Sequence, residues 1–367
     1  MSKTICLLLA CSLAIGCGSS SFEQTAKPAE TFKQSGESTT TLPPSIRDAV
    51  ATSTTSTTST TSTTSTTSTT STTSTTSTTS TTSTTSLPSA IRDSVTKSGI
   101  IVTKSGVTAE LLGQSAGGFL VRSPCGNQVL VPEGQPITRT QIVLDPGHGG
   151  RKDPGAVSRT GLKESDINLS IALATQLELG KLNISSVLTR TGNYASLLPI
   201  RAMLADALNA DALISIHHNS PSANPSSTPG TEVYVQSKSD RSQRLGALIY
   251  EKTFGYLSSI ANIDWVSRSD AGVIQVLNSK GSDAYGIIRR PATPSILLEL
   301  SYLSNPSEVE LITTDAYAKN ISKAIAAGVQ SFLMTDTTIS GPANKVRRYN
   351  PGSGLGSGSC DDALTAP

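Results

Sequence analysis

The three histidines of this 367-residue chain are the first candidates for chemistry, because two of them are adjacent. His217 and His218 lie in LISIHHNS, and His148 lies in VLDPGHGG. Glu164 follows His148 after a short loop, and Glu299 stands inside the apolar run ILLELSYL. Two histidines and one carboxylate are a ligand set of catalytic zinc sites, which keep one coordination position open for water. The sequence therefore raises the question of which of these side chains would hold a metal.

Each of these residues also has an ordinary structural interpretation. His148 is compatible with a loop histidine, and the pair His217–His218 with one ring in the core and one in solvent. Glu164 begins a predicted helix, where the helix dipole favours an acid. The spacing forms no compact metal motif such as HEXXH. A shared site therefore depends on whether the fold brings these residues to one place.

The elements that must position them alternate between strand and helix from residue 141 onward. Short apolar runs predict buried strands: IVLD, SSVLTR, ALISIH, EVYVQ, VIQVL and SILLEL. Helical apolar spacing lies between some of these runs, for example from Ile200 to Leu208. We predict an α/β fold with a mostly parallel, twisted sheet of about six strands and helices on both faces. Ligands bind such sheets beyond the carboxyl ends of the strands, where His148, His217 and Glu299 are expected.

A smaller unit precedes this domain. Residues 99–138 alternate apolar and polar side chains between turns that contain Gly and Pro, which is typical of short antiparallel strands. We expect a small antiparallel β module here, followed by a catalytic domain over residues 139–335. Residues 336–367 are rich in Gly and Ser and are predicted to form a flexible C-terminal tail.

Several segments, in order, resemble the zinc-dependent N-acetylmuramoyl-L-alanine amidases of bacterial cell walls. The matching segments are IVLDPGHGG, a Glu after a short loop, TR, LADALNADALISIHHN, GTEVYV and PSILLELSYLSNPSE. The resemblance covers about residues 141–333. It implies one Zn²⁺ per chain bound by His148, Glu164 and His217, with Glu299 as the catalytic acid–base. The implied reaction is cleavage of the amide between N-acetylmuramic acid and L-alanine in peptidoglycan.

The resemblance also separates the two adjacent histidines. In the family the ligand histidine follows SI, which corresponds to His217, and the next position is usually small. Alternation of side chains along a strand agrees that only one of the two points to the metal. We expect His218 to line the cleft or contact the stem peptide. Asn219 is expected to hydrogen-bond substrate, with a simple turn residue as the alternative. Residues 263–290 show no periodic helix of the kind that blocks some relatives, so the cleft is expected to be open.

Two other functions fit parts of the same pattern. One is a different zinc hydrolase of the cell wall, a peptidase or a deacetylase. The other is a wall-binding lipoprotein without catalytic activity. The 29 basic and 27 acidic side chains give a net charge of +2, which argues against nucleic acid or an anionic membrane surface as a partner. We expect peptidoglycan as the partner and a monomeric protein.

The N-terminus is typical of an export signal. Lys3 precedes the apolar stretch TICLLLACSLAIG, which is too short to span a membrane as a mature helix. Gly16 before Cys17 resembles the lipobox of bacterial lipoproteins, which implies a signal peptide over residues 1–16 and a lipid on Cys17. An ordinary secretory signal is the alternative. The mature chain is therefore expected in the cell envelope, anchored to the membrane only if Cys17 carries lipid, or secreted.

A long tether is predicted between the export signal and the β module. Residues 52–86 consist almost entirely of STT repeats, which have no apolar surface to bury and so do not fold. Two related segments, LPPSIRDAVATS and LPSAIRDSVTKS, flank the repeat. They indicate an internal duplication, or a short binding motif present twice. We assign residues 17–98 as a disordered tether.

Two cysteines remain for the folded part of the exported chain. Cys6 and Cys11 leave with the signal peptide, and Cys17 is either lipidated or free. Cys125 and Cys360 then face an oxidising compartment, where free thiols are uncommon. We predict a disulfide between them that fixes the tail to the β module. The alternative is two unpaired thiols.

Overall fold

The computed structural model describes most of the chain from residue 99 onward. The described residues are 99–220, 228–261, 264–335, 345–352, 354, 356 and 359–365. The predicted signal peptide, the lipidation candidate Cys17 and the tether with its Ser/Thr repeat lie outside the described residues. Within the described part, the helices are too short or too polar to cross a membrane.

A small antiparallel sheet comes first, as the sequence predicts. It has five strands in the order β4-β3-β2-β1-β5, and each neighbouring pair is antiparallel. The side chains of Ile101, Ala109, Val121 and Val131 form its buried cluster. The strands are β1 (Gly99–Thr103), β2 (Thr108–Ser115), β3 (Gly118–Arg122), β4 (Gln128–Val131) and β5 (Gly134–Ile137).

The second sheet has seven strands in the order β12-β10-β9-β11-β8-β6-β7. The pair of β9 and β11 is antiparallel, and the other five pairs are parallel. The prediction of an α/β fold with a mostly parallel sheet is confirmed. The strands are β6 (Ile142–Pro146), β7 (Ser186–Leu188), β8 (Ala212–Asn219), β9 (Glu232–Val235), β10 (Gly272–Leu277), β11 (Ser295–Tyr302) and β12 (Lys345–Arg348).

Strand β12 corrects the prediction of a flexible tail over residues 336–367. It pairs in parallel with β10 at the edge of the sheet. Three of its four residues are exposed. Its sequence KVRR therefore need not alternate apolar and polar residues, and it lacks the pattern that identifies a half-buried strand. The strand is held by backbone pairing on one side and by the ion pair between Arg347 and Glu232 of β9. Neither interaction leaves a local pattern in the sequence.

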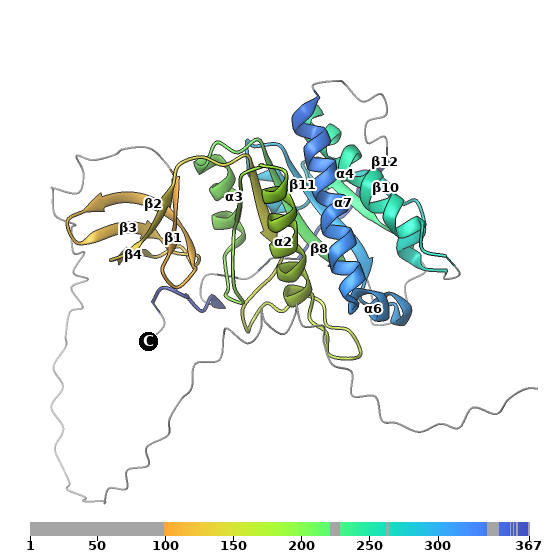
Figure 1. Ribbon diagram of the computed structural model, residues 1–367, viewed down its shortest axis with the longest axis horizontal. Coiled ribbons are helices and arrows are strands. Elements are labelled where there is room, and N and C mark those ends of the chain that lie inside the picture. Colours follow the sequence, from red (N-terminus) through yellow and green to blue (C-terminus); the bar gives the residue numbers. More distant parts are fainter. Residues whose placement is uncertain are drawn as a thin grey trace, which may run out of the picture. The chain divides into compact units, whose positions relative to one another are not determined.

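Helices cover both faces of the seven-stranded sheet (Figure 1). Side chains of α2, α4 and α7 share one apolar cluster with the sheet, and side chains of α3 and α5 share the other. Successive residues of a strand enter opposite clusters, as with Leu144 and Val143 of β6. The helices are α2 (Glu164–Lys181), α3 (Leu198–Ala207), α4 (Asp240–Ser258), η2 (Val266–Arg268), α5 (Gly286–Arg289), α6 (Pro306–Ile312) and α7 (Asp315–Met334).

The C-terminal residues end against the small sheet. A disulfide joins Cys360 to Cys125, whose Cα atoms lie 5.7 Å apart. Next to it, the carboxylate of Asp362 accepts hydrogen bonds from the Ser123 hydroxyl and from the Asn127 side-chain amide. The segment after β12 is thus fixed at both ends, by a strand at one end and by this cluster at the other.

Candidate metal and active site

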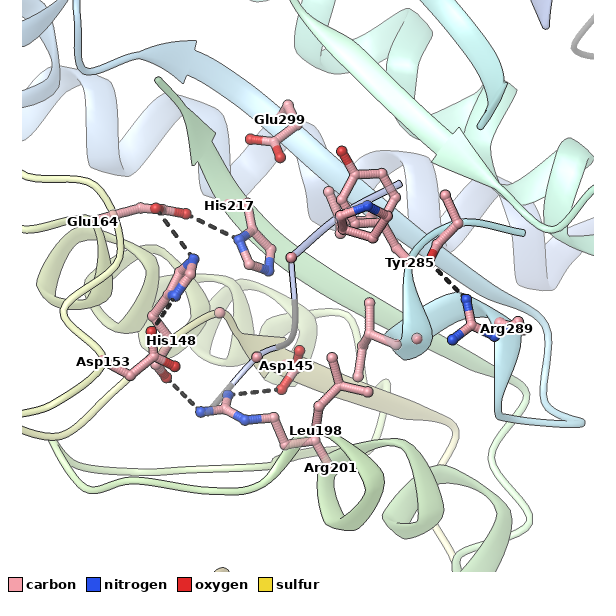
Figure 2. Close-up of a pocket in the computed structure, with 18 of the residues that line it drawn as sticks. Asp145, His148, Asp153, Glu164, Leu198, Arg201, His217, Tyr285, Arg289 and Glu299 are labelled. Carbon is pink, nitrogen blue, oxygen red and sulfur yellow. Dashed lines mark hydrogen bonds and ion pairs between the residues drawn. The ribbon is translucent and has the colours of Figure 1, made fainter. Parts of the chain in front are cut away.

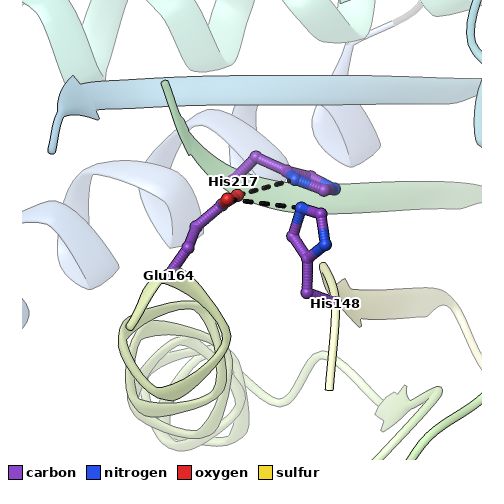
Figure 3. A group of neighbouring side chains, drawn as sticks. All are labelled: His148, Glu164 and His217. Carbon is purple, nitrogen blue, oxygen red and sulfur yellow. Dashed lines mark hydrogen bonds and ion pairs between the residues drawn. The ribbon is translucent and has the colours of Figure 1, made fainter. Parts of the chain in front are cut away.

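Three side chains from three different elements converge at the carboxyl ends of β6 and β8 in the large sheet (Figure 3). His148 follows β6, Glu164 begins α2, and His217 lies near the end of β8. One ligand atom from each lies within 4.8 Å of the other two. Oε1 of Glu164 is 2.9 Å from Nδ1 of His217, and Oε2 is 3.3 Å from Nε2 of His148. The fold therefore brings together the three residues that the sequence predicts as metal ligands.

Glycines allow the three side chains to approach one another. A Cβ atom on Gly147 would lie 2.2 Å from the ring of His217. A Cβ atom on Gly155 would lie 2.6 Å from Oε2 of Glu164, and this residue also has a φ of +68°, which favours glycine. Any larger residue at either position would displace a predicted ligand.

Buried arginines hold the loop that carries His148. The Arg190 side chain donates to four backbone carbonyls, including those of Pro146 and Gly147. Arg201, from α3, donates to the carbonyl of His148 and to the carboxylate of Asp145 in β6. Asp145 is buried, and its pKa is lowered because Arg201 and neighbouring hydroxyls outweigh the effect of burial. We therefore interpret Arg190, Arg201 and Asp145 as residues that hold the loop in place and not as catalytic residues.

Asp153 is a supporting residue that the sequence analysis did not identify. Its carboxylate lies 2.7 Å from Nδ1 of His148, so the other ring nitrogen is directed toward Glu164. Metal-binding histidines generally have such a partner, which fixes the tautomer and the ring orientation. The available signal was a carboxylate five residues after a histidine in the same glycine-rich loop.

The charges of the cluster are those of a cation site. Burial favours the neutral form of Glu164. The hydrogen bonds from His148 and His217 outweigh burial, so the pKa of Glu164 lies well below its usual range. Burial likewise opposes the charge on His148, but its contacts with Asp153 and Glu164 raise its pKa to about 10. The carboxylates therefore draw positive charge into this position, here a proton on the imidazole.

Glu299, the predicted acid–base, lies next to the cluster. It is paired in register with His217 across the parallel strands β11 and β8, so the two side chains share a sheet face. Its Oε2 atom is buried and has no hydrogen-bond partner among the described residues. Burial, together with the charges of Glu164 and Glu232, raises the pKa of Glu299 well above its usual range. A buried carboxyl with a raised pKa is suited to take up and release a proton as a general acid or base.

His218 is among the residues that line the cavity described below, but its ring is buried and makes its hydrogen bonds within the protein. Its ring points to the opposite face of the sheet, where Nδ1 is 2.8 Å from Oδ1 of Asn168 and Nε2 is 2.9 Å from the hydroxyl of Tyr317. Burial lowers its pKa to about 4, so the ring is neutral at physiological pH. Strand alternation explains the difference from His217, because adjacent residues of β8 face opposite sides.

A cavity of about 980 Å³ lies over this edge of the sheet (Figure 2). The three clustered side chains and Glu299 line it, and so does Asn219 at the end of β8. Other parts of its wall come from α3, α5 and the segment after β12. Residues 264–290 contain only η2 and α5, each of four residues or fewer, besides strand β10. The cavity is thus compatible with the open cleft that the sequence predicts.

Comparison with known proteins addresses the identity of this fold. A family profile for N-acetylmuramoyl-L-alanine amidases matches residues 142–331, just over half of the chain. This chain belongs to the N-acetylmuramoyl-L-alanine amidase family. The match begins at β6 and ends within α7, so the whole predicted ligand set and Glu299 fall inside it. The small sheet and β12 fall outside it.

This amidase-family chain is also similar to individual proteins. It is 29% identical over 223 residues to the N-acetylmuramoyl-L-alanine amidase AmiC of Neisseria meningitidis, covering 54% of this chain and 53% of that protein. It is 32% identical over 215 residues to the Bacillus subtilis protein YqiI, covering 58% and 92%. A solved N-acetylmuramoyl-L-alanine amidase from Clostridium difficile is 30% identical, with a TM-score of 0.47, over 55% of this chain and 100% of that one. The chain spans about half the length of the Neisseria relative.

Proposed function

We propose that this protein is an exported peptidoglycan hydrolase that cleaves the amide between N-acetylmuramic acid and the L-alanine of the stem peptide. The reaction would use one Zn²⁺ per chain. Within the chain, residues 139–335 would form the catalytic domain and residues 99–138 an accessory β module. The family membership supports the reaction class, and the site geometry supports the distribution of roles.

The proposal rests mainly on the four candidate side chains that gather at the carboxyl ends of the strands. His148, Glu164 and His217 converge within 4.8 Å, and Glu299 is the register partner of His217. All four line the same cavity. A hydrolytic metal site requires three protein ligands, an open position for water and a nearby proton carrier. The three clustered side chains would be the ligands, and Glu299 would be the proton carrier.

The donor set fits zinc. Two imidazole nitrogens and one carboxylate are typical zinc ligands, and Asp153 supplies the outer partner that orients His148. His148, Glu164 and His217 would hold the ion. When bound, zinc supplies Lewis-acid activation of water and of the scissile carbonyl.

Glu299 would move the proton that hydrolysis requires. Its unpartnered Oε2 can accept a proton from the attacking water and then donate it to the departing alanine nitrogen. Its buried position raises its pKa, so the proton is retained long enough to be passed on. Asn219, which also lines the cavity, is proposed to hydrogen-bond the substrate.

The proposed location follows from the substrate. Peptidoglycan lies outside the cytoplasmic membrane, so the protein must be exported to act on it. We propose that it works in the cell envelope, anchored by a lipid on Cys17 if that residue is modified, or in secreted form. We also propose that it acts as a monomer, since His148, Glu164 and His217 complete the predicted ligand set within one chain.

A digest of purified cell wall tests the reaction. Mass spectrometry of the soluble products should show intact stem peptides with a free L-alanine amine and glycan strands without peptides. Products cut within the peptide would indicate a peptidase, and loss of acetyl groups would indicate a deacetylase. Binding to the wall without release of fragments would indicate a non-catalytic wall protein.

A further inference from the structure

A second buried carboxylate lies beside Glu299. Glu232 of β9 is fully buried and is the register partner of Glu299 across the antiparallel strands β9 and β11. Directly paired residues of antiparallel strands have Cβ atoms about 4.5–5.5 Å apart on the same face. His217, Glu299 and Glu232 therefore form one row across three neighbouring strands. Two adjacent buried carboxylates normally share a proton or require a cation.

Arg347 of β12 supplies that cation. Its Nη1 atom is 2.9 Å from Oε2 of Glu232, and its Nη2 atom donates to Oε1, so the pair is bidentate. The hydroxyl of Tyr234 donates to the same carboxylate. Bidentate arginine–carboxylate pairs fix orientation as well as charge. Both oxygens of Glu232 are therefore occupied, whereas Oε2 of Glu299 has no partner among the described residues.

We infer that Arg347 is a positioning residue for Glu299, acting through Glu232. Because both oxygens of Glu232 accept hydrogen bonds from Arg347, the Glu232 side chain is held as an acceptor and offers no hydrogen to Glu299. Oε2 of Glu299 thus stays available for the substrate. This inference rests on the proposed function, in which Glu299 carries the proton. It also gives a role to β12, which lies outside the matched family region of residues 142–331.

Loss of the arginine would convert the two carboxylates into a hydrogen-bonded pair. An uncompensated buried Glu232 takes up a proton, because ionisation without a partner is costly in a buried site. Protonated Glu232 can then donate its hydrogen to the open oxygen of Glu299. Glu299 would then be hydrogen-bonded to Glu232 and no longer available to the substrate. Turnover would fall although the metal ligands and substrate contacts stay in place.

Three variants of the full chain test this chemistry. Arg347→Met removes the cation and should lower kcat at least about 10-fold, with KM changed less than about twofold and zinc content unchanged. Arg347→Lys keeps the charge and should retain most of kcat. Arg348→Met is the matched control, since Arg348 lies on the same strand and, among the described residues, donates to the Asn278 carbonyl and not to Glu232. It should retain wild-type kcat.

A double variant separates positioning from mere structural support. Glu232→Leu/Arg347→Met removes both charges together, a replacement that proteins often tolerate, and leaves no proton donor beside Glu299. It should regain most of the kcat lost in Arg347→Met. Wild-type kcat in Arg347→Met, or equal loss of kcat in the single and double variants, would overturn the inference.

The inference can fail separately from the proposed function. A zinc-loaded wild-type protein that releases no stem peptide would overturn the proposed function. The pair of Arg347 and Glu232 can still be tested by thermal unfolding of metal-free protein. Metal-free Arg347→Met should unfold at a lower temperature than metal-free wild type. The double variant should recover that temperature. Equal unfolding temperatures of wild type and Arg347→Met would overturn the inference in that case.

Discussion

Glu299 and His217 occupy the same register position on the neighbouring parallel strands β11 and β8. Parallel pairing places both side chains on the face covered by α3 and α5, at the edge where His148 and Glu164 arrive from a loop and a helix start. The proposed proton carrier Glu299 is thereby placed beside a predicted metal ligand by the register of the two strands.

The two adjacent histidines should behave differently when replaced by alanine. His217→Ala should lose zinc, because it removes a predicted ligand. His218→Ala should keep zinc but lose stability of the order of 1–3 kcal/mol, since Asn168 and Tyr317 lose a buried hydrogen-bond partner. Elemental analysis and denaturant unfolding of both variants measure these effects. Equal zinc loss in the two variants would contradict the assignment of His217.

Replacement of Glu299 by glutamine should abolish most turnover and leave the metal site intact. Glutamine keeps the shape of the side chain but cannot accept a proton. We expect full zinc content and a fall in kcat of at least about 100-fold, within the usual contribution of general acid–base catalysis. Near-normal turnover in a fully zinc-loaded Glu299→Gln protein would exclude the proposed role.

Zinc binding at neutral pH should release a proton from His148. Its pKa of about 10 in the metal-free protein means that the imidazole carries a proton at pH 7, and a zinc ligand must be neutral. Calorimetric titration with zinc in buffers of different ionisation enthalpy measures the number of protons released. We expect about one from His148, and a smaller number in an Asp153→Asn variant, whose His148 loses a contact that favours the proton.

The same shift makes the stability of the metal-free protein depend on pH. A histidine whose pKa is raised on folding stabilises the fold below its unfolded pKa of about 6.5, and this contribution is lost as pH rises toward 10. The unfolding free energy of metal-free protein should therefore fall between pH 6.5 and 10 more steeply than that of a His148→Gln variant. Identical slopes would contradict the charged state assigned to His148.

The disulfide between Cys125 and Cys360 should contribute to stability. It closes a loop with a sequence separation of 235 residues, so removing it in Cys360→Ser should cost at most about 5.5 kcal/mol in the chain-entropy model. Thermal unfolding of exported wild type and Cys360→Ser measures the difference. Alkylation without reductant followed by intact-mass measurement is the control, and labelling of both cysteines in exported wild type would show that the bond does not form.

Much of the fold could be predicted because its strands are buried on both faces. Runs such as IVLD and SILLEL contain nearly continuous apolar residues, and a charged residue within such a run stands out. Glu299 was identified by that signal. Glu232, in EVYV, gives the same signal and was nevertheless missed, because its partner Arg347 lies 115 residues away on an exposed edge strand.

Other features depend on tertiary contacts that no local pattern contains. Asp153 and His148 meet through the turns of a glycine-rich loop. The ring of His218 is directed by strand alternation, but only the packing of α2 and α7 provides its partners Asn168 and Tyr317. Strand β12 forms through pairing with β10 and not through its own propensity.

The central claim is that His148, Glu164 and His217 hold one zinc ion beside Glu299. Anomalous diffraction at the zinc absorption edge, from crystals of zinc-loaded protein, tests it most directly. The account predicts one strong peak per chain, within about 2.0–2.2 Å of a ligand atom from each of the three residues. Protein with one equivalent of zinc by elemental analysis, but with its anomalous peak at other residues, would contradict the claim.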